Sequence, residues 1–138
     1  MRHKAKVDSA VFGASGTFWD SLGKAWDGYM GRSQRAKGAT GEREFCSYLN
    51  EHLGCETKRN LMQTREGGCD TWLQIAGSLS CAIEIKRVER LQLRAAVDQV
   101  LAVDADLHAV AHRTNGKPWL VTMPIDSWVQ LVREAGVE

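Results

Sequence analysis

The stretch Cys81-Ala82-Ile83-Glu84-Ile85-Lys86-Arg87 decides the fold of this chain. As a β-strand, it places its cysteine and both isoleucines on one face, and Glu84 and Lys86 on the other. A carboxylate and an ammonium group therefore stand side by side on a strand whose reverse face is apolar. Buried charge is costly unless it is paired or bound to an ion. The pair is either an ordinary salt bridge or part of an ion-binding site.

Turn signals and periodicity around this strand predict an α/β protein. A strand over 70–75 and a tight turn at Gly77-Ser78 precede the central strand, which we place at 81–88. Thr40 is expected to cap a helix that ends at Gly54, and Pro124 to open a final helix whose apolar side carries Ile125 and Trp128. The other expected elements are a short helix near 17–30, a short strand at 55–62, a helix at 89–103, and strands at 107–112 and 119–123. The fold predicted is a mixed central sheet flanked by helices.

Length and composition indicate a water-soluble protein with one main domain. The chain has 138 residues, 43% of them apolar and 25% charged, and it contains no apolar run of membrane-spanning length. We therefore expect no membrane partner and a cytoplasmic location. The four cysteines lack C-x-x-C spacing, which favours reduced, mostly buried thiols. Residues 1–36, rich in Gly, Ser and aromatic residues, are expected to form an arm, with the main domain over 37–138.

Two further acids extend the charged strand into a cluster. Glu42 lies three, four and seven residues before Phe45, Cys46 and Leu49, so we expect it on the sheet-facing side of its helix, with Glu44 pointing away. Asp70 follows Gly67-Gly68, where a loop meets a strand. Each acid has an ordinary explanation, because a first-turn glutamate suits the helix dipole and an aspartate suits a turn. The combination of all these charges favours a site.

The residue types fit metal-assisted phosphodiester hydrolysis. Mg²⁺ prefers oxygen ligands, and Asp70, Glu84 and the backbone carbonyl of Ile85 can supply them. A bound metal acidifies water and neutralises charge on a phosphate. Lys86 can orient or deprotonate that water and stabilise the transition state. We therefore predict a Mg²⁺ cofactor, for which Mn²⁺ can substitute.

Basic residues are clustered near these acids although the net charge is only +1. One cluster lies just before and within the predicted helix, a second follows the central strand, and a third, around Lys58, Arg59 and Arg65, lies between them. A single basic cluster usually marks a solvated surface, whereas three clusters around one site favour a phosphate-backbone partner. The residues expected to contact nucleic acid are Arg35, Lys37, Arg43, Arg65 and Arg87.

Taken in order, these motifs resemble the PD-(D/E)XK nuclease superfamily over roughly residues 34–132, and within it archaeal Holliday junction resolvases and small phage resolvase-like nucleases. The matching residues are Lys37-Gly38, Glu42-Arg43-Glu44-Phe45, Gly68-Cys69-Asp70 and Ile83-Glu84-Ile85-Lys86. The resemblance implies a restriction-endonuclease-like core. It also implies catalytic roles for Glu42, Asp70, Glu84, Lys86 and, on the following helix, Gln99. Residues 1–36 have no counterpart in this comparison.

The resulting hypothesis is a magnesium-dependent endonuclease that hydrolyses DNA in a structure-selective way, as a Holliday junction resolvase does. Two symmetric nicks in a branched DNA suit a two-fold homodimer, with Trp119 and Trp128 as interface candidates. The alternative is a non-catalytic nucleic-acid-binding protein that retains the nuclease fold. A sequence-specific restriction enzyme fits less well, because the chain has little room for base-reading insertions.

Overall fold

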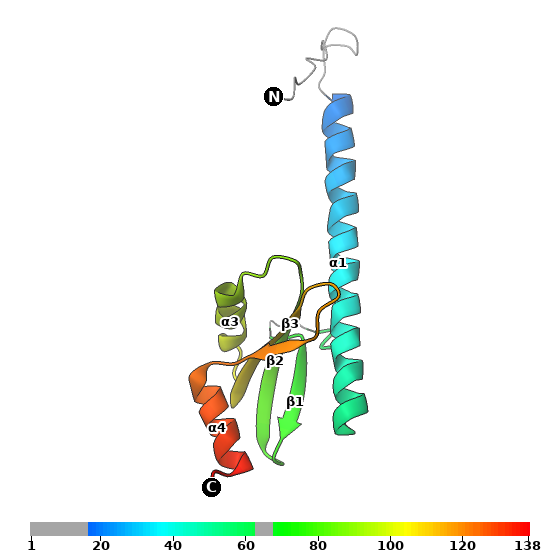
Figure 1. The fold of residues 1–138 in the computed structure, drawn as a ribbon. Coiled ribbons are helices and arrows are strands. Elements are labelled where there is room, and N and C mark those ends of the chain that lie inside the picture. Colours follow the sequence, from blue (N-terminus) through cyan, green and yellow to red (C-terminus); the bar gives the residue numbers. More distant parts are fainter. Residues whose placement is uncertain (1–16, 63–67) are drawn as a thin grey trace. The chain divides into compact units, whose positions relative to one another are not determined.

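The computed structural model describes the backbone of residues 17–62 and 68–138, with side chains from residue 35 onward (Figure 1). The chain divides into two compact units, residues 1–36 and residues 37–138. The second unit contains the sheet and all of the described candidate site residues except Arg35. Within the described ranges, none of the helices combines the length and the apolar character needed to cross a membrane.

One long helix replaces the two helices predicted before the sheet. Helix α1 runs without interruption over Thr17–Leu53, so Thr40 lies inside the helix and does not cap it. Gly38 and Gly41 also lie inside the helix. At Gly41 the helix comes so close to the sheet that an added Cβ would lie 2.9 Å from the Cβ of Arg87. This glycine therefore permits close packing and does not end the helix.

The sheet is mixed and open, with strand order β1-β2-β3-β4. Strands β1 (Thr71–Ile75) and β2 (Leu79–Arg87) form an antiparallel hairpin through a turn in which Ala76 and Gly77 have positive φ. Strand β3 (Leu107–Arg113) is parallel to β2, and the short β4 (Leu120–Thr122) is antiparallel to β3. The predicted strand at 55–62 is reduced to one isolated bridge, between Arg59 and Thr71.

Two hydrophobic clusters cover the two faces of the sheet, which confirms the α/β class with helices flanking a mixed sheet. Helix α3 (Leu93–Leu101) connects the parallel strands and packs its buried alanine and valines on Ala82 and Val110 (Figure 1). On the opposite face, Phe45 of α1 packs on Ile83 and Ile85. The predicted alternation of β2 is confirmed, because its isoleucines and Glu84 belong to opposite faces. All four cysteines are free thiols, and three of them are buried.

The last helix, α4 (Ile125–Ala135), begins after Pro124, as the sequence predicted. Ser127 is buried, its hydroxyl accepts a hydrogen bond from the His108 amide at 3.0 Å, and Leu131 packs against the core. On the predicted apolar side of the helix, Ile125 and Trp128 are exposed, whereas Val129 and Val132 are half-buried. The apolar side of α4 is therefore only partly covered.

Candidate active site

The β1–β2 hairpin brings the two central acids together. Thr71 lies opposite Ile83 in the antiparallel register, so Asp70, at the mouth of the hairpin, lies beside Glu84. The Asp70 amide donates to the Ile83 carbonyl at 3.0 Å, and the Ile85 amide donates to Asp70 Oδ2 at 2.7 Å. The aspartate is thus fixed to the central strand by both its backbone and its side chain.

Both carboxylates are withdrawn from water. Asp70 is 6% exposed and Glu84 is 2% exposed. Burial, together with the nearby charge of Glu84, raises the pKa of Asp70 from 3.8 to about 6, although the Ile85 amide and Lys86 oppose the shift. Glu84 Oε2 is buried and has no hydrogen-bond partner among the described residues. A buried, unpartnered carboxylate oxygen is costly unless something binds it, so this atom is the strongest indication of an ion site.

Lys86 links the carboxylates to helix α3. Its Nζ lies 2.9 Å from Glu84 Oε1, so the ordinary salt bridge considered for this pair is present. The same Nζ donates to Gln99 Oε1 at 3.3 Å. The structure therefore brings together four predicted catalytic residues: Asp70, Glu84, Lys86 and Gln99.

The backbone carbonyl of Ile85 is directed to the same edge of the strand as Asp70. Residues two apart on a strand point their backbone groups to the same side. The Ile83 carbonyl and the Ile85 amide both bond to Asp70, so the Ile85 carbonyl also points toward the β1 side, beyond the end of that strand. The Ile85 carbonyl is therefore directed to the edge of β2 at which Asp70 lies.

Glu42 is held apart from this pair by an arginine. Arg59 Nε contacts Glu42 Oε2 at 2.5 Å, which anchors the segment after α1 to the helix. Cys46, one turn further along α1, lies between the two acidic positions: burial raises the pKa of its thiol, and the charges of Glu42 and Asp70 act in the same direction. Glu42 therefore borders the site, and its carboxylate is paired with a guanidinium. The Arg59 partner was not predicted, although the basic cluster around it was noted.

Glu44 does not point away from the sheet as the sequence predicted. It forms ion pairs with Arg113 at 2.7 Å and with Arg87 at 3.7 Å, at the ends of adjacent strands. Arg113 also lies over the ring of Trp119, 5.5 Å from its centroid. Helical periodicity did not predict these ion pairs, because the long side chains of the arginines extend beyond the last apolar residues of the strands.

Some of the residues predicted to contact nucleic acid are exposed, and others are already paired within the protein. Arg35, Lys37 and Arg43 are exposed on α1. Arg87 is engaged with Glu44, and Arg65 lies outside the described residues. A hollow of about 520 Å³ between α1 and the following segment is lined by three cationic side chains, which belong to Arg43, Lys58 and Arg59.

The donor set fits a hard divalent cation that keeps most of its waters. Within the described ranges, no group of three or more His, Cys, Asp or Glu side chains is arranged as a complete metal site. Mg²⁺ does not require one, because it is commonly held by one or two carboxylates with waters and phosphate oxygens. Asp70 and Glu84, with one unsatisfied oxygen, match that requirement.

Comparisons with known proteins found no match to this chain: no protein-family model, no curated protein and no solved structure matches it.

Proposed function

We propose that residues 37–138 form a restriction-endonuclease-like domain that hydrolyses DNA phosphodiester bonds with Mg²⁺ as cofactor. One observation carries the proposal: two buried carboxylates, Asp70 and Glu84, meet on adjacent strands beside Lys86, and one Glu84 oxygen has no partner in the described protein. A purely structural salt bridge needs only one acid. The second acid and the unsatisfied oxygen support an ion-binding role.

Each residue then has a distinct task. Asp70, Glu84 and the Ile85 carbonyl hold the cation, which when bound acidifies water and neutralises charge on the phosphate. Lys86, the more exposed member of its ion pair, orients the attacking water and stabilises charge that develops on the phosphate oxygens. Gln99 positions Lys86 through its hydrogen bond. Glu42 holds water on the α1 side of the site, either after its ion pair with Arg59 opens or while that ion pair persists.

The proposed substrate is DNA, and branched DNA in particular. The exposed cations Lys37 and Arg43 on α1 and the hollow lined by Arg43, Lys58 and Arg59 lie on the Glu42 side of the acids, where they suit contacts to the phosphate backbone. Such contacts position a strand without reading its sequence. This arrangement supports selection by DNA shape.

We also propose that the protein acts as a homodimer. Strand β4 is an edge strand, and its Leu120 and Val121 are exposed beside Ile125 of α4. A neighbouring apolar hollow of about 550 Å³ lies between α3 and the start of α4. Of the two interface candidates, Trp128 is exposed, and Trp119 packs on Phe45 with ring centroids 5.1 Å apart. Light scattering on the purified protein should give twice the chain mass, and a monomer at micromolar concentration would contradict this part of the proposal.

The function is tested by incubating the protein with four-way junctions, flaps, duplex and single strands, with Mg²⁺ or with chelator. Cleavage should require Mg²⁺, and Glu84→Gln and Lys86→Ala should each lower its rate by about a hundredfold or more. Glu134→Gln and Lys117→Ala, which alter exposed residues, serve as matched controls and should cut normally. Binding without cleavage in every metal condition would instead favour the non-catalytic nucleic-acid-binding protein.

A further inference from the structure

An exposed tryptophan stands next to the candidate catalytic acids. Trp72 on β1 lies directly opposite Ala82 in the antiparallel register, so both side chains belong to the same face of the sheet. Glu84 follows Ala82 by two residues on that face. Diagonal neighbours of this kind are roughly 7–8 Å apart, within reach of an aromatic side chain. The indole is therefore a near neighbour of the proposed metal site.

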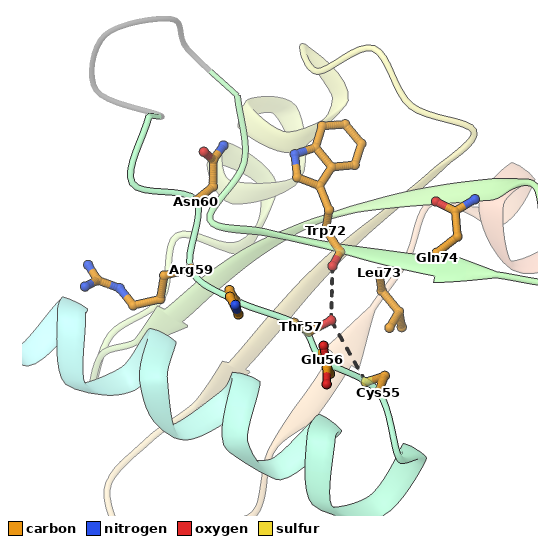
Figure 2. A pocket seen from close by; sticks show the side chains of 9 residues that line it. Cys55, Glu56, Thr57, Arg59, Asn60, Trp72, Leu73 and Gln74 are labelled. Carbon is orange, nitrogen blue, oxygen red and sulfur yellow. Dashed lines mark hydrogen bonds between the residues drawn. The ribbon is translucent and has the colours of Figure 1, made fainter.

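The sheet leaves this indole uncovered. Helix α3 packs on Ala82 of β2 and Val110 of β3, and does not extend over the edge strand β1. Trp72 is consequently 39% exposed, although the indole is the largest apolar side chain available for burial. Figure 2 shows the ring projecting from the strand on the same side as the Asn60 side chain.

The backbone under the tryptophan is firmly held. The Thr57 hydroxyl donates to the Trp72 carbonyl at 3.2 Å (Figure 2), and the Thr71 hydroxyl donates to the Lys58 carbonyl at 2.6 Å. Trp72 lines a pocket together with Lys58, Arg59, Asn60 and others. The Arg59 side chain points away from the indole (Figure 2) and is paired with Glu42 of α1. The same pocket also contains the Glu56 carboxylate, so its cationic excess is small.

We propose that Trp72 is a platform on which an unpaired base of the DNA stacks, next to the phosphate that is cut. Aromatic rings beside a cationic groove are the usual means of holding single-stranded nucleic acid, because every base offers a face for stacking. A base paired inside a regular duplex has no free face. Trp72 thus selects DNA with unstacked nucleotides at the cleavage site, as at a junction, a flap or a gap.

This inference rests on the proposed function for the identity of the ligand, but its test needs no cleavage. Fluorescence anisotropy in the presence of chelator measures the affinity for a labelled single strand and for a duplex of the same sequence. The wild-type protein should bind the single strand more tightly. Trp72→Leu, which keeps apolar bulk without a π-face, should weaken single-strand binding by on the order of tenfold and leave duplex binding unchanged.

Two further variants guard against a folding artefact. Trp72→Phe retains an aromatic face and should keep most of the single-strand preference. Tyr48→Ala removes another exposed aromatic residue, on α1, and should have no effect. A 2-aminopurine base in the single strand gives a direct readout, because stacking on Trp72 should quench its fluorescence and Trp72→Leu should restore it.

The outcomes separate the two proposals. Equal affinities of wild type and Trp72→Leu for the single strand would overturn the stacking role, even if the protein cleaves DNA. Loss of single-strand preference in Trp72→Leu but not in Trp72→Phe would support it, even if no metal produces cleavage. A wild-type protein that binds duplex as tightly as single strand would also refute the inference.

Discussion

Replacing Asp70 by asparagine should stabilise the metal-free protein at neutral pH, because the site places a charge where folding disfavours it. Burial and the neighbouring Glu84 raise the pKa of the Asp70 carboxyl from 3.8 to about 6. A rise of this size corresponds to roughly 3 kcal/mol between the two protonation states. The Asp70→Asn side chain keeps an oxygen that can accept from the Ile85 amide, but it carries no charge.

The direction of the pH dependence of stability follows from the protons that the folded and unfolded states bind. Between about pH 4 and pH 6 the folded protein holds a proton on Asp70 that the unfolded chain has already released. The contribution of this group to stability is therefore fully present below pH 3.8 and is lost as the pH rises through about 6. Asp70→Asn has no such loss. Its free energy of unfolding relative to wild type should increase by up to about 3 kcal/mol between pH 4 and pH 8.

Urea unfolding in chelator at several pH values measures this difference, in which the titrating groups that do not interact with Asp70 cancel. Asp104→Asn, at an exposed position, is the matched control and should show no pH-dependent difference. Added Mg²⁺ should stabilise wild type and not Asp70→Asn, because a ligand that binds only the folded state raises its stability. A difference between Asp70→Asn and wild type that is constant from pH 4 to pH 8 would refute the reasoning.

Two other substitutions test the packing and the hydrogen bonding around the site. Gly41→Ala should lower the free energy of unfolding by about 1–3 kcal/mol, because its Cβ would lie 2.9 Å from the Cβ of Arg87. Gly38→Ala, whose Cβ would meet no atom within 4 Å, should raise the free energy of unfolding by up to about 1 kcal/mol. Equal effects of the two substitutions in urea unfolding would contradict the close approach of Gly41 to Arg87. Gln99→Ala should slow Mg²⁺-dependent cleavage by roughly 3- to 10-fold in a single-turnover assay, since one hydrogen bond to Lys86 is lost; an effect as large as that of Lys86→Ala would instead assign Gln99 a direct catalytic role.

The local parts of the fold were predictable because short-range chemistry sets them. The alternation of β2 and the glycine-containing turn after β1 each depend on a few adjacent residues. The pairing of Asp70 with Glu84 followed from the hairpin register, and the bond between Lys86 and Gln99 is consistent with the role expected from the family resemblance.

The predictions that failed depended on partners distant in the sequence. Thr40 carries a helix-start signal, but packing of Gly41 against Arg87 favours a continuous helix. Periodicity identifies an apolar stripe without showing what covers it, so it did not predict that Ile125 and Trp128 would be exposed while Leu131 packs against the core. Likewise, no pattern in the sequence indicates that α3 stops short of β1 and leaves Trp72 uncovered.

The position of both carboxylates of the proposed metal site in one hairpin has a consequence for folding. Hairpin contacts between β1 and β2 close a short loop of chain. The parallel pairing of β2 with β3 closes a longer loop, which contains α3. The carboxylate pair is therefore expected to assemble early, before the sheet is complete. Fraying of the short edge strand β4 would leave it intact, so local opening of the far side of the domain need not release the cation.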